Sequence, residues 1–369
     1  MRNILKNTDY LILIFCIILI IIGIVGIYSA GINSQSSKTE YLKQIMWVGI
    51  SLVAMFFVWI IDYNVSSIVG IVLYPILLIL LVVVLFTAEI NGASSWFNIG
   101  PIQIQPSEFM KIAYILSLAK YLEYITNKGK NNINRITYLL LAFLICILPV
   151  GLIMLQPDFG TAIVFLSITF FMLFKAKISY KYIIGLILII LVVAPLIYFF
   201  VLSDYQKTRI LVFLNPEIEP LGAGYNAIQS KIAVGSGMIF GTGIGKGTQT
   251  QWGYLPVKSS DFIFSVISEE MGFIISISIV ILFVLILFRT LKIANTAKDK
   301  LGSYIACGIF GMFFFHFLEN IGMTIGLMPI TGIPLPFVSY GGSSMLTNLI
   351  ALGLLLSISA RRQRTLFVD

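Results

Sequence analysis

Long apolar runs separated by short polar segments occupy most of the chain. A helix needs about 20 predominantly apolar residues to cross a bilayer. By that measure the sequence predicts about ten transmembrane helices, near residues 10–30, 44–61, 68–87, 106–122, 137–155, 158–174, 181–202, 262–288, 302–326 and 342–360. One long polar segment, residues 203–261, separates the seventh from the eighth. We therefore expect an all-α, polytopic integral membrane protein that forms a single membrane domain over residues 1–369, with 203–261 as a loop within it.

The composition agrees with a membrane protein and excludes other classes. Of the 369 residues, 59% are hydrophobic and only 11% are charged, whereas soluble domains carry about 25% charged residues. The net charge of +8 does not indicate nucleic-acid binding, because the basic residues are spread along the chain without a dense run. Cys16, Cys146 and Cys307 stand singly in apolar runs and show no metal or disulfide spacing. The sequence shows no separate soluble domain of useful length, so any activity must lie in the bundle or its loops.

The basic residues predict an orientation. With the N-terminus inside, most of them fall on cytoplasmic connections, as the positive-inside rule requires. They are Arg2, Lys6, Lys120, Lys128, Lys130, Arg135, Lys175, Lys177, Lys181, Arg289, Lys292, Lys298, Lys300, Arg361, Arg362 and Arg364. We therefore expect both termini in the cytoplasm and residues 203–261 on the opposite, outer face.

The stretch 247–272 carries the most informative polar pattern. Asp261, Ser265, Glu269 and Gly272 follow one another at intervals of three or four residues, so they would share one face of a helix. A carboxylate at the outer start of a membrane helix, with polar groups below it, would face a cavity rather than lipid. We predict that Asp261 does chemistry there; the alternative is an N-cap aspartate.

Four of the expected helices begin on the outer face with turn and cap residues. These openings are Gln105-Pro106-Ser107-Glu108, Gln156-Pro157-Asp158, Ser259-Ser260-Asp261 and the stretch from Pro336 to Ser344. The first two place proline at the favoured first helical position. If the four ends converge, their positive termini face one outer cavity, which suits an anionic phosphate group. Ser339 and Tyr340 are then candidate ligands of that group.

Several charges are expected within the membrane or at its edge. Glu108 and Lys111 lie one turn apart on one helical face. They form either a structural ion pair or a basic group for phosphate that a carboxylate holds in place. Asp158 is either a first-turn acid that complements the helix dipole or a site residue. Glu269 and Glu270 lie about two turns into the eighth span, where burial argues for a role or a partner.

The ninth expected span carries His316, the only histidine, and Glu319. His316 fits a packed, hydrogen-bonded side chain better than a metal ligand or a proton relay. Glu319 raises the same question as the glutamates of the eighth span, because a buried carboxylate needs a partner or a role.

The loop 203–261 has its own features. Its candidate phosphate partners are Arg209, Lys231, Lys246 and Lys258. The stretches 211–219 and 225–237 fit short amphipathic segments that lie at the membrane interface. The glycine-rich run 241–247 fits a mobile loop better than a phosphate-binding loop, because no strand precedes it.

Together these residues resemble the SEDS family (the shape, elongation, division and sporulation proteins, among them RodA, FtsW and SpoVE) over nearly the whole chain. The matching stretches are Tyr28-Ser29-Ala30, Gln105 to Lys111, Gln156 to Ala162, Asn215-Pro216-Glu217, Gln229-Ser230, Gly247-Thr248-Gln249, Asp261 to Phe264 with Glu269-Glu270, and Gly332 to Ser344. The stretch Asn320 to Pro329 looks like RodA, whereas the short loop Gly241 to Gln249 is nearer to FtsW and SpoVE. Val257 and Ser259-Ser260 depart from the residues usual before the aspartate.

The resemblance implies a ten-helix fold and a peptidoglycan glycosyltransferase that polymerises lipid II on the outer face of the bacterial cytoplasmic membrane. The family's essential aspartate falls on Asp261, its intramembrane pair on Glu108 and Lys111, and its Gln-Pro-Asp acid on Asp158. Arg209 matches the basic residue before Asn-Pro-Glu. The implied partners are lipid II, the lipid bilayer and a class B penicillin-binding protein.

In the mechanism that this resemblance suggests, Asp261 accepts the proton of the attacking sugar hydroxyl. Lys111, Arg209 and the helix N-termini would offset the charge of the leaving diphosphate. A divalent cation, Mg²⁺ or Mn²⁺, could assist, although the spacing shows no ligand cluster. Two alternatives stay open: a transporter of the lipid-linked precursor, and a non-catalytic scaffold for the transpeptidase. The pattern does not decide between elongation, division and sporulation.

Overall fold

A computed structural model describes residues 7–33, 39–87, 95–100, 102–129, 132–182, 204–215 and 222–362, together with isolated positions between 184 and 219. Within this part of the chain, helices occupy nine of the ten expected spans. They are α2 (Tyr10–Gly31), α3 (Glu40–Ile60), α4 (Tyr63–Val84), α5 (Pro106–Lys128), α6 (Ile136–Leu155), α7 (Phe159–Lys175), α12 (Ile263–Thr296), α13 (Lys300–Ile325) and α14 (Gly342–Ala360). The seventh expected span, 181–202, lies largely outside the described residues, as do Pro216 and Glu217.

The lengths and compositions of the helices fit a membrane. Among the described helices, seven are long and apolar enough to cross a bilayer, and α7 is a shorter apolar helix. The helix α5 has the length, with 23 residues, but carries several charges. Most residues of α5 are buried inside the bundle, so those charges are shielded from lipid.

Helices α13 and α14 lie at the centre of the bundle. In their most apolar windows 72% and 83% of the residues are buried, against 28% in α3, α4 and α6. The outer helices turn apolar side chains outward, as Phe57 in α3 and Ile79 in α4 do at 60% and 64% exposure. An apolar surface of this kind is stable only against lipid. The protein is therefore a multi-pass membrane protein.

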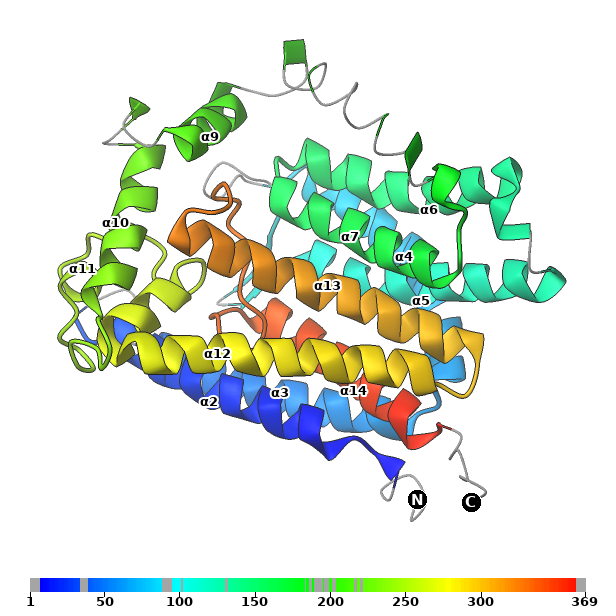
Figure 1. The fold of residues 1–369 in the computed structure, drawn as a ribbon, viewed down its shortest axis with the longest axis horizontal. Coiled ribbons are helices and arrows are strands. Elements are labelled where there is room, and N and C mark those ends of the chain that lie inside the picture. The colour runs from blue at the N-terminus through cyan, green and yellow to red at the C-terminus, as the bar shows by residue number, and fades with distance from the viewer. Residues whose placement is uncertain are drawn as a thin grey trace.

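The helices lie side by side along the long axis of the molecule, so that their ends gather at two opposite ends of the bundle (Figure 1). At one, which we call the site end, α12 begins and α13 finishes. At the other, the basic end, α12 finishes and α13 begins, and there α2 begins and α14 finishes as well. Arg289, Lys292, Lys300 and Arg361 belong to the basic end.

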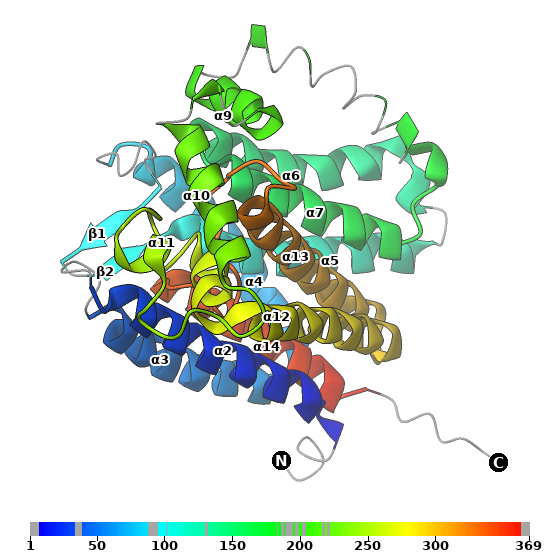
Figure 2. The ribbon, with the colours of Figure 1, turned by 60° about the vertical axis from the view of Figure 1, so that its left-hand side comes forward.

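The polar loop expected at 203–261 forms several short elements at the site end (Figure 2). These are α9 (Asp204–Leu214), α10 (Ala223–Ser236) and α11 (Thr248–Gln251). Helix α10 covers most of the stretch 225–237 that was expected to be amphipathic, and α9 covers the first part of the stretch 211–219. A hairpin of β1 (Phe97–Ile99) and β2 (Ile102–Ile104) precedes α5.

Helix α12 is interrupted at Gly272, where φ is 77° and ψ is −176°. The break frees backbone groups that the loop takes up. The carbonyls of Glu269 and Glu270 accept hydrogen bonds from the N–H groups of Thr242 and Gly243. In return, the N–H groups of Phe273 and Ile274 donate to the carbonyls of Met238 and Ile239. The loop thus completes the hydrogen bonding of a broken membrane helix, which explains how the break is tolerated there.

We expect Gly272→Ala to destabilise the protein by at least about 3 kcal/mol, because this backbone conformation is essentially limited to glycine. A Cβ atom there would also lie 2.3 Å from the backbone nitrogen of Gly241. Thermal unfolding in detergent measures the change. Gly49→Ala is the matched control, since a Cβ at Gly49 in α3 meets nothing within 4 Å. Equal stability of the two variants would contradict the prediction.

Candidate functional site

Asp261 lies in the turn that leads into α12, not within the helix. The helix starts at Ile263 with Phe262 at the N-cap, and that cap forms no side-chain hydrogen bond. The alternative of an N-cap aspartate is therefore wrong. The expectation of one continuous polar face from Asp261 to Gly272 is also wrong, because the first residue precedes the helix and the last one breaks it.

The segment that precedes α14 holds the turn around Asp261 in place. The Tyr340 N–H donates to the carbonyl of Ser259 at 2.9 Å, and the Ser339 hydroxyl donates to the carbonyl of Ser260 at 2.7 Å. The same hydroxyl accepts from the Leu335 N–H at 2.8 Å. Ser339 therefore lies beside Asp261, but its hydroxyl connects two backbone segments.

Asn320 joins Asp261 to the same segment from the α13 side. Its amide nitrogen donates to the carbonyl of Asp261 at 3.0 Å and to that of Ile333 at 2.8 Å. The Asp261 carboxylate accepts from the Ser260 hydroxyl at 3.0 Å. A Cβ atom at Gly332 would lie 3.2 Å from that carboxylate, so the absence of a side chain there leaves room for it.

The expected pair of Glu108 and Lys111 is present and fully buried. The Lys111 ammonium lies 2.9 Å from Glu108 Oε1 and 2.9 Å from His316 Nε2. The other ring nitrogen of His316 is 3.1 Å from the carbonyl of Pro334. This confirms the expectation of a packed, hydrogen-bonded histidine. It also links the ion pair to the segment that Asn320 connects to Asp261.

One residue, Gln105, connects the beginnings of α5, α7 and α14. Gln105 is the residue before α5, and its side-chain amide nitrogen donates to Asp158 Oδ2 at 3.1 Å. Its backbone N–H donates to the Ser343 hydroxyl at 3.3 Å. The expected convergence of these helix N-termini is therefore present at the site end.

Asp158 caps α7. Its carboxylate accepts from the Thr161 N–H at 3.1 Å, as expected for an acid that complements the helix dipole. Burial raises the pKa of Asp158, while the hydrogen bonds from Thr161 and the positive charge of Lys111 act in the opposite direction. Pro157 precedes this cap, so the expected first helical position is right for Pro106 but wrong for Pro157.

Glu269 and Glu270 fasten the loop rather than face the turn of Asp261. Glu269 accepts from the N–H groups of Gln249 and Thr250 at 2.8 and 2.9 Å, and from the Thr250 hydroxyl at 2.7 Å. Glu270 accepts from the Gly245 N–H at 3.1 Å, the Gln251 amide at 2.7 Å and the Ser29 hydroxyl. The partners expected for these buried carboxylates are thus present.

These contacts also correct the expected mobility of the glycine-rich run 241–247. Its backbone is held to α12 at Thr242 and Gly243, and to Glu270 at Gly245 and Gly247. A Cβ atom at Gly241 would lie 2.2 Å from the carbonyl oxygen of Glu270. The glycines therefore permit close packing against α12 rather than motion.

The remaining candidates belong to α9, α10, α13 and the segment before α14. Lys231, on α10, is exposed and extends over Gly326 at the end of α13. The backbone of Arg209 belongs to α9, but its side chain lies outside the described residues. Tyr340 is half-buried, and burial raises the pKa of its hydroxyl. Glu319, on α13, accepts from the Thr331 hydroxyl at 2.9 Å.

Glu108 Oε2 and Asn320 Oδ1 are among the buried acceptor atoms at the site end that have no hydrogen-bond partner in the part of the chain that the structure describes. A buried acceptor of this kind needs a donor from elsewhere. The described residues contain no group of three or more His, Cys, Asp and Glu side chains that could hold a metal ion. The site thus presents acceptors and one buried ammonium.

Sequence reasoning missed Asn320 and the connecting role of His316. Both contacts join residues far apart in the chain, so local spacing gives no sign of them. A buried amide one turn from a lone histidine, in a span with few polar groups, was the available signal.

Comparison with known proteins gives matches along almost the entire chain. Residues 9–364 match a family model for FtsW, RodA and SpoVE, described as cell cycle protein. The chain is 38% identical to the peptidoglycan glycosyltransferase RodA of Treponema pallidum, over 97% of this chain and 98% of the relative. It is 39% identical to the stage V sporulation protein E of Bacillus subtilis, over 96% and 97%.

Solved structures agree. A chain in a structure described as the structural coordination of polymerization and crosslinking by a peptidoglycan synthase complex superposes with a TM-score of 0.82 at 30% identity, over 97% of this chain and 99% of that one. The rod shape determining protein RodA of Thermus thermophilus gives a TM-score of 0.71 at 28% identity, over 97% and 98%.

Proposed function

The chain belongs to the FtsW, RodA and SpoVE family, and we infer that it is a peptidoglycan glycosyltransferase that polymerises lipid II. Relatives with 37–38% identity carry that enzyme name, and they align over most or all of the chain. The observation that carries the inference is the turn at Asp261: a carboxylate outside the helix, positioned by Asn320, Ser339 and Ser260.

Lipid II carries a disaccharide-peptide on an undecaprenyl diphosphate. In polymerisation the 4-hydroxyl of an acceptor sugar attacks the anomeric carbon of the donor, and the bond from that carbon to the diphosphate breaks. The lipid diphosphate leaves without the general acid that an alcohol would need. The Asp261 carboxylate accepts the proton of the attacking hydroxyl. One base is therefore sufficient for this reaction.

Lys111 and the N-termini of α5, α7 and α14 offset the negative charge of the diphosphate. Lys111 carries its charge within a buried pair, and charges act over longer distances there than in water. The N-termini of α5, α7 and α14, joined through Gln105, add positive partial charges. Arg209, Lys231 and Tyr340 make supporting contacts to the head group. Asp158 positions Gln105 by accepting the hydrogen bond from its amide nitrogen.

We place this site on the extracytoplasmic face, because Arg289, Lys292, Lys300 and Arg361 lie at the other end of the bundle. The prenyl chain can then stay in the bilayer while the head group reaches Asp261. A class B penicillin-binding protein is the proposed partner, since a structural neighbour of this chain belongs to a complex that couples polymerization to crosslinking. A divalent cation would be brought by the diphosphate, since the described residues contain no group of three or more His, Cys, Asp and Glu side chains that could hold one.

The test is polymerisation of lipid II by the purified protein, alone and with its transpeptidase, with and without a chelator. Glycan strands separated by length are the readout, and their formation is expected. A transporter would instead move lipid II between leaflets of a proteoliposome without forming glycan strands. That result in the presence of the partner would contradict the proposed function.

A further inference from the structure

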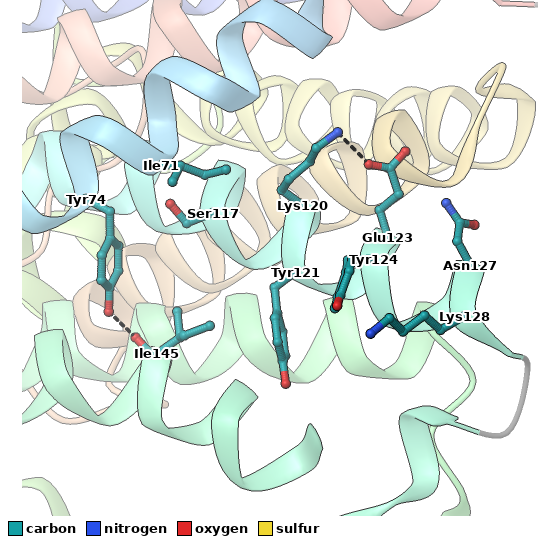
Figure 3. Close-up of a pocket in the computed structure, with 10 residues that line it drawn as sticks. All are labelled: Ile71, Tyr74, Ser117, Lys120, Tyr121, Glu123, Tyr124, Asn127, Lys128 and Ile145. Atoms are coloured by element: carbon teal, nitrogen blue, oxygen red, sulfur yellow. Dashed lines mark hydrogen bonds and ion pairs between the residues drawn. The ribbon is translucent and has the colours of Figure 1, made fainter. Parts of the chain in front are cut away.

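A pocket lies away from Asp261, between α4, α5 and α6, and extends towards the basic end. Its volume is about 810 Å³, which is within the range of ~300–1,000 Å³ found for small-molecule sites. The side chains that line it include Ile71, Tyr74, Lys120, Glu123, Tyr124 and Lys128 (Figure 3). None of them takes part in the site at Asp261.

The pocket is apolar at one end and basic at the other. Tyr74 and Ser117 lie at the apolar end, and their hydroxyls are already used: they donate to the carbonyls of Ile145 and Gly70 at 2.6 and 3.2 Å. With these groups satisfied, the wall there is effectively hydrocarbon. A ligand at this end gains by burying an apolar chain.

The basic end carries an excess of positive charge. Lys120 pairs with Glu123 at 2.8 Å, and its side chain is 38% exposed. Lys128 lies 4.4 Å from the centre of the Tyr124 ring and has no acidic partner within the lining, which therefore contains two lysines and one glutamate (Figure 3). Tyr124 is itself 54% exposed. Lysine beside exposed tyrosine is typical of the headgroup level of a membrane.

The length of the pocket fits one leaflet. From Ser117 to Lys128, α5 rises about 16 Å at 1.5 Å per residue, which is about half of the ~30 Å hydrocarbon core. We propose that this pocket binds one anionic phospholipid of the leaflet at the basic end. Its phosphate lies at Lys120 and Lys128, and its acyl chain lies along Tyr74 and Ile145.

The experiment is native mass spectrometry of the delipidated protein titrated with phosphatidylglycerol or phosphatidylcholine. One phosphatidylglycerol should bind in preference to phosphatidylcholine. The double variant Lys120→Gln/Lys128→Gln should bind phosphatidylglycerol about 25-fold more weakly, since each lysine contributes about fivefold. Lys292→Gln, which removes one exposed lysine at the basic end outside the pocket, should leave binding unchanged.

A second variant tests the apolar end. Ile71→Trp fills that end without a change of charge, and should weaken phosphatidylglycerol binding while the protein elutes and melts as the wild type does. Equal binding of the two lipids by the wild type would overturn the proposal, as would equal binding by the double variant and Lys292→Gln. Binding of inorganic phosphate as tight as that of phosphatidylglycerol would instead indicate a site for soluble anions.

Discussion

Asp261→Asn is expected to lower the rate of lipid II polymerisation by about 10²–10⁴-fold, the range that a positioned general base contributes. Asparagine has nearly the same shape and can still accept the hydrogen bond from the Ser260 hydroxyl, but it cannot take up a proton at neutral pH. The carbonyl that binds Asn320 belongs to the backbone and is unchanged. Glycan strand formation from purified lipid II measures the loss.

The control separates chemistry from folding. Asp62→Asn changes a carboxylate that caps α4 at the basic end through the Asn64 N–H, and it should leave polymerisation unchanged. The Asp261→Asn protein should have the thermal stability of the wild type, because asparagine keeps the hydrogen bond from Ser260 and leaves the backbone contact to Asn320 unchanged. Normal glycan strands from Asp261→Asn would reject the assignment of the base. A large loss of stability would point to a structural role.

The fold was largely predictable because the bilayer imposes a simple rule on sequence. Each span must be long, apolar and helical, so runs such as 10–30 and 137–155 correspond closely to α2 and α6. Polar breaks and prolines fixed the starts of helices to within a few residues, as at Pro106. The expected pairing of Glu108 with Lys111 followed from helical spacing and the cost of an isolated buried charge.

The parts that could not be predicted depend on contacts between distant residues. The break at Gly272 is stable only because residues 238–243 supply hydrogen bonds to it, and no periodicity reveals such a partner. For the same reason the face from Asp261 to Gly272 was expected to be continuous. Glu269 and Glu270 had the burial of site residues, but only the structure shows that they bind the loop at 245–251.

Lys111→Met is expected to destabilise the protein by about 3–5 kcal/mol, the usual result of removing one partner of a buried ion pair. Glu108 would be left 2% exposed without its ammonium, and His316 would lose the group next to its Nε2 atom. Thermal unfolding in detergent measures the loss. A variant as stable as the wild type would mean that water or another cation reaches Glu108.

The double variant Glu108→Gln/Lys111→Met distinguishes the two interpretations of the pair. It removes both charges at similar volume, so most of the lost stability should return, because a neutral buried pair avoids the cost of an unpaired charge. If Lys111 serves only the fold, polymerisation should return with stability. If its charge offsets the diphosphate, as proposed, polymerisation should stay reduced by at least about tenfold, since each 1.36 kcal/mol of lost transition-state stabilisation lowers the rate tenfold. Recovery of both properties would therefore leave the convergent N-termini of α5, α7 and α14 as the source of positive charge.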